Sequence, residues 1–212
     1  ERPVRPWYAR LFGGAPARGP VEATVGALRE ALADGTAPHV ALVSSAAGVD
    51  GTDWWWEAVR LLELHPEVAA VGGAVLDRGG RIVTAAPVLD AAGRWTVPQA
   101  GRSADDPGPF AIALKPHCVA GVPTDLFVAE RTLLADVLGA LPPGAPLAGL
   151  GARLGLAALA RGRRVAFSPL IRATLRGPSL DDMPEAAAAR AVSEALAAEG
   201  AGDPTIGRAK EI

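Results

Sequence analysis

Residues 39–48 read His39-Val40-Ala41-Leu42-Val43-Ser44-Ser45-Ala46-Ala47-Gly48, and this stretch decides the fold class. Its first five residues form a short apolar run with β-branched side chains, which is typical of a buried strand. The Ser-Ala-Gly stretch that follows predicts a loop at the end of this strand. Because α/β folds bind ligands at the carboxyl ends of parallel strands, this loop is the first candidate binding region.

Helical patterns flank this strand on both sides. Before it, apolar residues recur every three or four positions over 21–32, with Pro20 suited to a first turn and Gly35 to a stop. After it, Asp53 is expected to be the N-cap of a helix that runs through Leu64. Helix, strand and helix in this order predict an α/β domain.

The rest of the chain continues the alternation of short apolar runs and helical periods. The turn at 77–80 predicts a hairpin, since Asp-Arg-Gly-Gly tolerates positive φ angles. Residues 98–116 lack periodicity and predict a long loop, which in a compact domain is more often functional than accidental. The other expected elements are strands at 68–76, 81–86, 118–122, 126–129 and 164–167, the last stopped by Pro169, and helices at 131–138 and 150–161.

Composition places the chain among ordinary globular proteins. Its 212 residues are 50% hydrophobic and 21% charged, with a formal net charge of -2. This charge offers no attraction to nucleic acid, and no apolar run approaches membrane-spanning length, so neither partner is expected. With Cys118 as the single cysteine no intrachain disulfide can form, and we expect a cytoplasmic protein.

Three segments follow from these patterns. Residues 1–19 hold two small apolar clusters between prolines and glycines, as expected for an N-terminal arm. Residues 20–177 form the α/β domain. Residues 178–212 are expected to form a C-terminal helix, capped by Asp181 and Asp182, and a tail.

Four stretches carry a pattern that goes beyond fold class. They are residues 26–32 ahead of the first strand, Asp53-Trp54-Trp55, the strand and hairpin over 68–82, and residues 160–165 with Pro169. In this order and spacing they resemble the second half of the GT-A fold of glycosyltransferase family 2, over roughly residues 22–175. The resemblance implies a mixed sheet flanked by helices, of the nucleotide-diphospho-sugar transferase type, with a shortened N-terminal half.

The resemblance also implies where catalytic groups should be, and this sequence departs from it there. The family's metal-binding Asp-x-Asp falls at Ser45 and Ala47, and neither side chain is a carboxylate of the kind that hard divalent cations require. The family's acidic catalytic base falls at Leu150 and Gly151, with Arg153 where another acid often follows. We therefore expect no bound metal and no cofactor.

These departures predict a non-catalytic binding or scaffolding module of a larger glycan-building protein. Its expected partners are a sugar or nucleotide-sugar ligand and other domains or subunits of that protein. The alternative is an active glycosyltransferase that uses Mg²⁺ or Mn²⁺ with a nucleotide sugar. Substitute carboxylates such as Asp50, Asp53 or Asp105, or a donor site completed by another chain, would then supply the missing groups. The third hypothesis is an α/β binding domain that is unrelated to this glycosyltransferase family.

Several further residues are candidate ligand contacts. Successive helix residues point about 100° apart, so at most two of three consecutive tryptophans enter the core, and Trp54 and Trp56 are candidates to face a ligand. Asp105 and Asp106 would hold a cation if the long loop folds back, or else are solvated. His117 lies beside the same loop, but Cys118 points to the opposite face of a strand, which argues against a catalytic pair.

Overall fold

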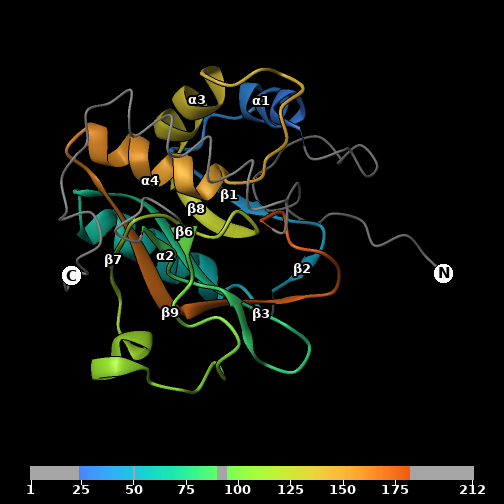
Figure 1. Ribbon diagram of the computed structural model, residues 1–212. Helices are drawn as coiled ribbons and strands as arrows, with labels where there is room; N and C mark the ends of the chain where they lie inside the picture. The colour runs from blue at the N-terminus through green and yellow to red at the C-terminus, as the bar shows by residue number, and fades with distance from the viewer. Residues whose placement is uncertain (1–23, 50, 90–94, 182–212) are drawn as a thin grey trace.

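The computed structural model describes residues 24–49, 51–89 and 95–181. The chain is an α/β protein whose open mixed sheet has seven strands and is flanked by helices (Figure 1). The strands of this sheet are β1 (His39–Val43), β2 (Ala47–Gly48), β3 (Val68–Leu76), β4 (Ile82–Thr84), β7 (His117–Val119), β8 (Leu126–Glu130) and β9 (Arg164–Leu175). They lie in the order β1-β8-β3-β9-β2, with β4 paired to β3 and β7 paired to β9. Two further strands, β5 (Val88–Leu89) and β6 (Trp95–Thr96), pair only with each other.

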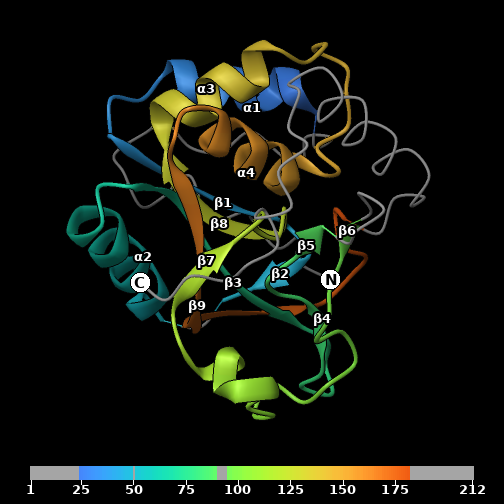
Figure 2. The same ribbon diagram turned by 60° about the vertical axis from the view of Figure 1, so that its left-hand side comes forward.

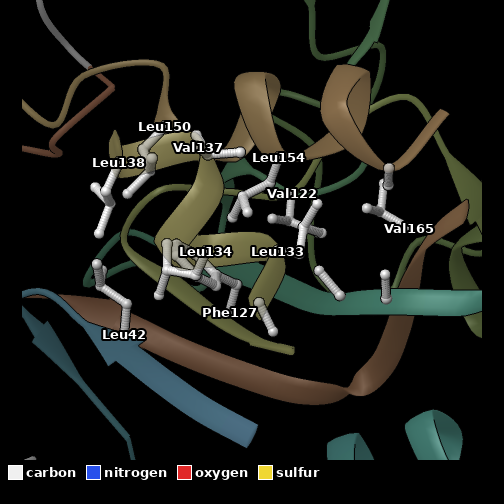
Figure 3. Packing of buried hydrophobic residues seen from close by; sticks show 14 of the residues in the cluster. Leu42, Val122, Phe127, Leu133, Leu134, Val137, Leu138, Leu150, Leu154 and Val165 are labelled. Carbon is white, nitrogen blue, oxygen red and sulfur yellow. The ribbon is translucent and has the colours of Figure 1, made fainter. Parts of the chain in front are cut away.

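Helices cover both faces of the sheet. Helices α1 (Val25–Ala33), α3 (Arg131–Gly139) and α4 (Leu150–Ala160) lie on one face, and α2 (Asp53–Leu64) lies on the other (Figure 2). The first face is filled by leucine, valine and phenylalanine side chains from α3, α4 and the strands beneath them, as Figure 3 shows. Because adjacent strand residues point to opposite faces, Leu42 packs toward α3 while Val43 packs toward α2.

One edge of the sheet gathers several strand ends. Strand β1 pairs antiparallel with β8, and β8 pairs antiparallel with β3, so β1 and β3 run in the same direction. Strand β3 pairs in parallel with β9. The carboxyl ends of β1, β3 and β9 therefore meet at one edge, together with the start of β8. This carboxyl edge is where α/β folds bind ligands.

Strand β9 is longer than the sequence pattern predicts. We expected the strand to stop at Pro169, but it continues to Leu175. Its register with β3 shifts between Gly72 and Ala74, where Phe167 and Arg172 are the successive partners, so the residues between them bulge out of the ladder. A proline in such a bulge needs no ladder hydrogen bond, and the prediction was wrong for this reason.

The structure also corrects two helix starts. Helix α1 begins at Val25 and not near Pro20, because Thr24 is extended and its side chain accepts a hydrogen bond from the Ala27 amide at 3.4 Å. In α2 the N-cap is Thr52, and Asp53 is the first helical residue. A carboxylate in the first turn still favours the helix through its dipole.

The predicted loop at 98–116 contains one regular element, the 3-10 helix η2 (Pro109–Leu114). Phe110 and Ala111 have φ angles of 54° and 55°, a left-handed conformation that costs about 1–2 kcal/mol for each non-glycine residue. The side chain of Phe110 is almost fully exposed. Helix η2 therefore presents an aromatic ring to solvent from a strained backbone.

Candidate functional site

The turn after β1 forms the first part of the carboxyl edge. The Ser44 amide donates to the Asp125 carbonyl oxygen at 2.9 Å, which extends the β1–β8 ladder by one pair. The Ser44 side chain is buried, and its hydroxyl makes no hydrogen bond within the described residues. The Ala47 amide closes the turn onto the Ser44 carbonyl oxygen at 3.0 Å. This leaves Ser45 as the exposed residue of the turn.

The two positions where the resemblance would put metal ligands are in different environments. Ser45 faces solvent, but Ala47 is buried in the core on the α2 face of the sheet. Ala47 belongs to β2 and pairs with Leu175 of β9. A carboxylate at position 47 would have to be desolvated in an apolar core. Within residues 24–49, 51–89 and 95–181, no group of three or more His, Cys, Asp or Glu side chains is arranged to hold a metal ion.

The positions of the expected base are closed by packing. Leu150 and Gly151 open α4, and both are buried. A Cβ atom at Gly151 would lie 1.7 Å from the carbonyl oxygen of Val122, and one at Gly155 would lie 1.8 Å from that of Ala120. Since backbone atoms cannot rotate away as a side chain can, no side chain fits at position 151. The segment 120–123 occupies the space that a catalytic acid would need.

A pocket of about 510 Å³ lies at the same edge, between the turn after β3 and the end of β9. The hairpin turn is held by the Asp77 side chain, whose Oδ1 accepts hydrogen bonds from the amides of Gly79 at 2.8 Å and Arg81 at 2.9 Å. We call this the arginine pocket, and its lining residues are Asp77, Arg78, Gly79, Val83, Leu175, Arg176 and Gly177.

A second polar group is buried nearby, and the sequence analysis missed it. This group, the buried aspartate cluster, links the start of β8 to the segment after β9. Its members are Thr124, Asp125, Ser179 and Asp181. Asp125 is fully buried and accepts hydrogen bonds from the Ser179 hydroxyl and from the Leu180 amide at 3.1 Å. The sequence signal that could have revealed this cluster is Asp125, a carboxylate within the largely apolar stretch between β7 and β8.

Asp181 turns its side chain back onto α4. Its Oδ2 accepts from the Thr124 amide at 2.9 Å, and its Oδ1 accepts from the amide of Gly149, the N-cap of α4, at 3.3 Å. Burial raises the pKa of Asp181, hydrogen bonds from Thr124 oppose the rise, and the nearby Asp125 carboxylate adds to it. The helix expected to begin at Asp181 and Asp182 lies outside the described residues.

This raised pKa predicts a pH dependence of stability. The folded state keeps the Asp181 proton to higher pH than the unfolded chain, whose pKa is near the ordinary 3.8. The contribution of Asp181 to the free energy of unfolding is therefore complete below this value and is lost as pH rises through the raised pKa. In urea unfolding from about pH 4 to about pH 7, Asp181→Asn should remove this decline. Asp136→Asn should retain it, and a decline that persists in Asp181→Asn would contradict the assignment.

The three tryptophans of α2 divide as their spacing predicts. Trp54 and Trp55 are 3% and 9% exposed and meet edge to face, with ring centroids 6.2 Å apart, whereas Trp56 is 65% exposed. Trp54 is thus part of the core, and only Trp56 offers its ring to a ligand. Asp53 is exposed at the start of the same helix. Asp50 lies outside the described residues.

The acidic pair of the long loop is engaged by arginines. Asp106 Oδ2 lies 3.0 Å from Arg102 Nη1, and its Oδ1 accepts from the Gly108 amide at 2.9 Å. The Gly108 hydrogen bond lowers the pKa of Asp106, and Arg102 lowers it further. Asp105 lies 3.8 Å from Arg172 Nη1 and is 91% exposed. The two carboxylates therefore serve different arginines.

His117 is a packed side chain. It is buried, its ring lies 5.2 Å from that of Phe167, and its Nδ1 lies 2.9 Å from the Lys115 carbonyl oxygen. Burial lowers the pKa of His117, and the contact with Lys115 opposes this. The lowered pKa favours the neutral ring, and its burial leaves little of the side chain accessible to a ligand.

The chain is therefore an α/β protein, and its candidate ligand site lies at the carboxyl ends of β1, β3 and β9. Its sequence matches no protein-family model and no curated protein. Across the described part of the chain, none of the helices has the length and apolar character needed to cross a bilayer.

Proposed function

We propose that this chain is a glycosyltransferase-like domain that binds a ligand at the carboxyl edge and does not catalyse transfer by itself. The mixed sheet with helices on both faces is compatible with the GT-A fold that the sequence resembles. The hairpin at 77–80 and helix α4, two of the elements on which the resemblance rests, both form. As part of a larger glycan-building protein, such a domain would hold a sugar or nucleotide sugar, or a neighbouring domain.

The observation that carries the proposal is the closed position at the start of α4. A general base contributes typically about 10²–10⁴-fold to a rate, and it must reach the proton that it removes. At Gly151 the Val122 carbonyl oxygen leaves no space for any side chain. At the other expected site, Ser45 and Ala47 supply no carboxylate and Ala47 is buried. Both losses point to binding without catalysis.

The alternative, an active enzyme with substitute carboxylates, is less well supported. Asp105 belongs to an ion pair with Arg172, and within the described ranges Asp53 belongs to no group of three or more His, Cys, Asp or Glu side chains that could hold a metal. The carboxylates of Asp125 and Asp181 accept hydrogen bonds from amide and hydroxyl donors of the chain itself. A metal at Asp125 or Asp181 would have to replace hydrogen bonds that hold the fold.

Incubation with nucleotide sugars tests the proposal directly. We expect no release of nucleoside diphosphate above the protein-free rate, with Mg²⁺, with Mn²⁺ or with a chelator. The chain should be folded in the assay, which a cooperative thermal transition verifies. Release of nucleoside diphosphate that depends on a divalent cation and stops on chelation would overturn the non-catalytic assignment and favour the alternative.

A further inference from the structure

The arginine pocket has a rigid backbone frame. Strands β3 and β9 are paired up to Leu76 and Thr174, directly before the residues that line the pocket. The Arg176 amide donates to the Ala46 carbonyl oxygen at 2.7 Å, and the Asp77 amide donates to that of Arg81 at 2.8 Å. Figure 1 shows β2 beside the last part of β9. Arg176 thus directly follows a hydrogen-bonded strand, and Arg78 lies in the turn that the Asp77 amide closes.

The Arg176 guanidinium lies over a glycine of β2. A Cβ atom at Gly48 would be 2.9 Å from both Nε and Nη2 of Arg176, so this side chain occupies the space that a larger residue would fill. A guanidinium is a planar group with five N–H donors. Packing one face against β2 orients the plane of the group, while Arg176 remains exposed at the pocket.

Arg78 reaches the same place from the hairpin. Its Nη2 donates to the carbonyl oxygen of Arg176 at 3.2 Å, which brings the second guanidinium to the end of β9. This bond uses one donor and no charge. Asp77, the acidic residue of the lining, already accepts two amide hydrogen bonds in its own turn. The lining therefore has two positive charges against one negative charge.

Arg78 and Arg176 have no carboxylate partner among the described residues, as is also true of Arg81, Arg153 and Arg164, but these two line one pocket together. Five arginines have a carboxylate within 4.0 Å: Arg60, Arg102, Arg161, Arg163 and Arg172. Across the described residues, no carboxylate comes within this distance of Arg78 or Arg176. Two cations gathered in one pocket repel each other unless an anion joins them. An anion from solution would supply that charge.

We propose that the arginine pocket binds a small ligand through a phosphate or diphosphate group, without a divalent cation. Arginine matches phosphate oxygens with paired, charge-assisted hydrogen bonds, and two guanidinium groups replace the charge that a metal ion would provide. The pocket is wide open to solvent, so a charged group can reach both arginines from solution. This inference rests on the proposed function, because it names the ligand class of the same edge.

Calorimetric titration in a buffer with a chelator tests this inference. Inorganic pyrophosphate and UDP should each bind at concentrations up to about 1 mM, and binding should weaken as salt is added. Uridine, which carries no phosphate, should not bind. No heat from either phosphate compound, or equal binding of uridine and UDP, would overturn the proposal. A higher affinity for UDP than for pyrophosphate would identify a nucleotide as the source of the phosphate group.

Variants locate the binding in the pocket. Arg78→Ala and Arg176→Ala should each weaken pyrophosphate binding by about tenfold or more, as expected for loss of a hydrogen bond between charged groups. Arg81→Ala removes the same charge from the same hairpin but lies outside the lining, so its affinity should stay within about twofold of the wild type. Equal losses in Arg81→Ala and the pocket variants would contradict the assignment.

A fourth variant tests geometry at constant charge. Gly48→Ala should push the Arg176 guanidinium away from β2 and weaken pyrophosphate binding while every charge remains. An unchanged affinity would mean that net charge alone attracts the ligand, which would contradict the proposal. If the wild-type protein binds neither pyrophosphate nor UDP and also shows no turnover, this inference is refuted and the proposed function stands. Metal-dependent turnover would refute the proposed function instead.

Discussion

Replacing Gly151 or Gly155 with alanine is expected to lower the free energy of unfolding by about 3 kcal/mol for each change. The added Cβ atoms would lie 1.7 and 1.8 Å from carbonyl oxygens of the segment 120–123, so the helix or that segment must move. The higher helix propensity of alanine offsets only about 1 kcal/mol of this cost. Urea unfolding followed by circular dichroism measures the difference.

Gly139 supplies the matched control. It is the last residue of α3, and a Cβ atom built there has no neighbour within 4 Å. Gly139→Ala should leave stability unchanged or raise it by up to about 1 kcal/mol. If Gly151→Ala and Gly155→Ala behave like this control, α4 does not pack against 120–123 as described. The argument that position 151 is closed to a catalytic acid would then fail.

Asp125→Ala is expected to lower the free energy of unfolding by about 3 kcal/mol. The change would remove the acceptor of the Leu180 amide and one acceptor of the Ser179 hydroxyl, at a position where Asp125 is fully buried. A buried donor left without its partner carries the full cost of its desolvation. The measurement is again the free energy of unfolding in urea.

Two comparisons define what this result means. Asp136→Ala removes an exposed carboxylate that pairs with Arg161 at 2.9 Å, and it should cost no more than about 0.5 kcal/mol. The double variant Asp125→Ala with Ser179→Ala should cost less than the sum of the single changes, because the two groups share one hydrogen bond. Additive effects, or an Asp125 variant as stable as the Asp136 variant, would contradict the described contact.

At the carboxyl edge, the buried aspartate cluster has a structural role, and the arginine pocket has the proposed binding role. Asp125 and Asp181 hold the segment 179–181 onto the start of β8 and α4, with their oxygen atoms directed at donors of the chain. Arg78 and Arg176 are exposed and line the pocket. Asp77 is the one negative group of the pocket lining, against the two arginines, and this balance favours an anionic ligand over a cation.

Local sequence predicted most of the secondary structure. Periodic apolar residues marked α2 and α4, and α2 ends at Leu64, where Pro66 stops it as expected. The hairpin between β3 and β4 followed from its turn residues. These features depend on interactions within a few residues, which is why a single sequence reveals them. The division of the tryptophans into core and surface followed from helix geometry in the same way.

Other features needed partners that are distant in the sequence. Strand β9 continues past Pro169 because β3 accommodates a bulge there, and no residue near Pro169 signals this. The pairing of Arg78 with Arg176 joins residues 98 positions apart. Asp125 reads as a turn residue before a strand until its contacts with 179–180 are known. The candidate ligand residues predicted from the sequence lie in the turn after β1, on α2 and around the long loop, and Arg78 and Arg176 are not among them.

By itself the sequence determined the α/β class, the helices and hairpin, and the absence of carboxylates at Ser45 and Ala47. Only the tertiary structure decided that position 151 has no space for a side chain, and that two arginines share one pocket. The reason is physical. Residue type and short-range periodicity set local conformation, whereas free space and the sum of charges at a point depend on which distant segments are packed together.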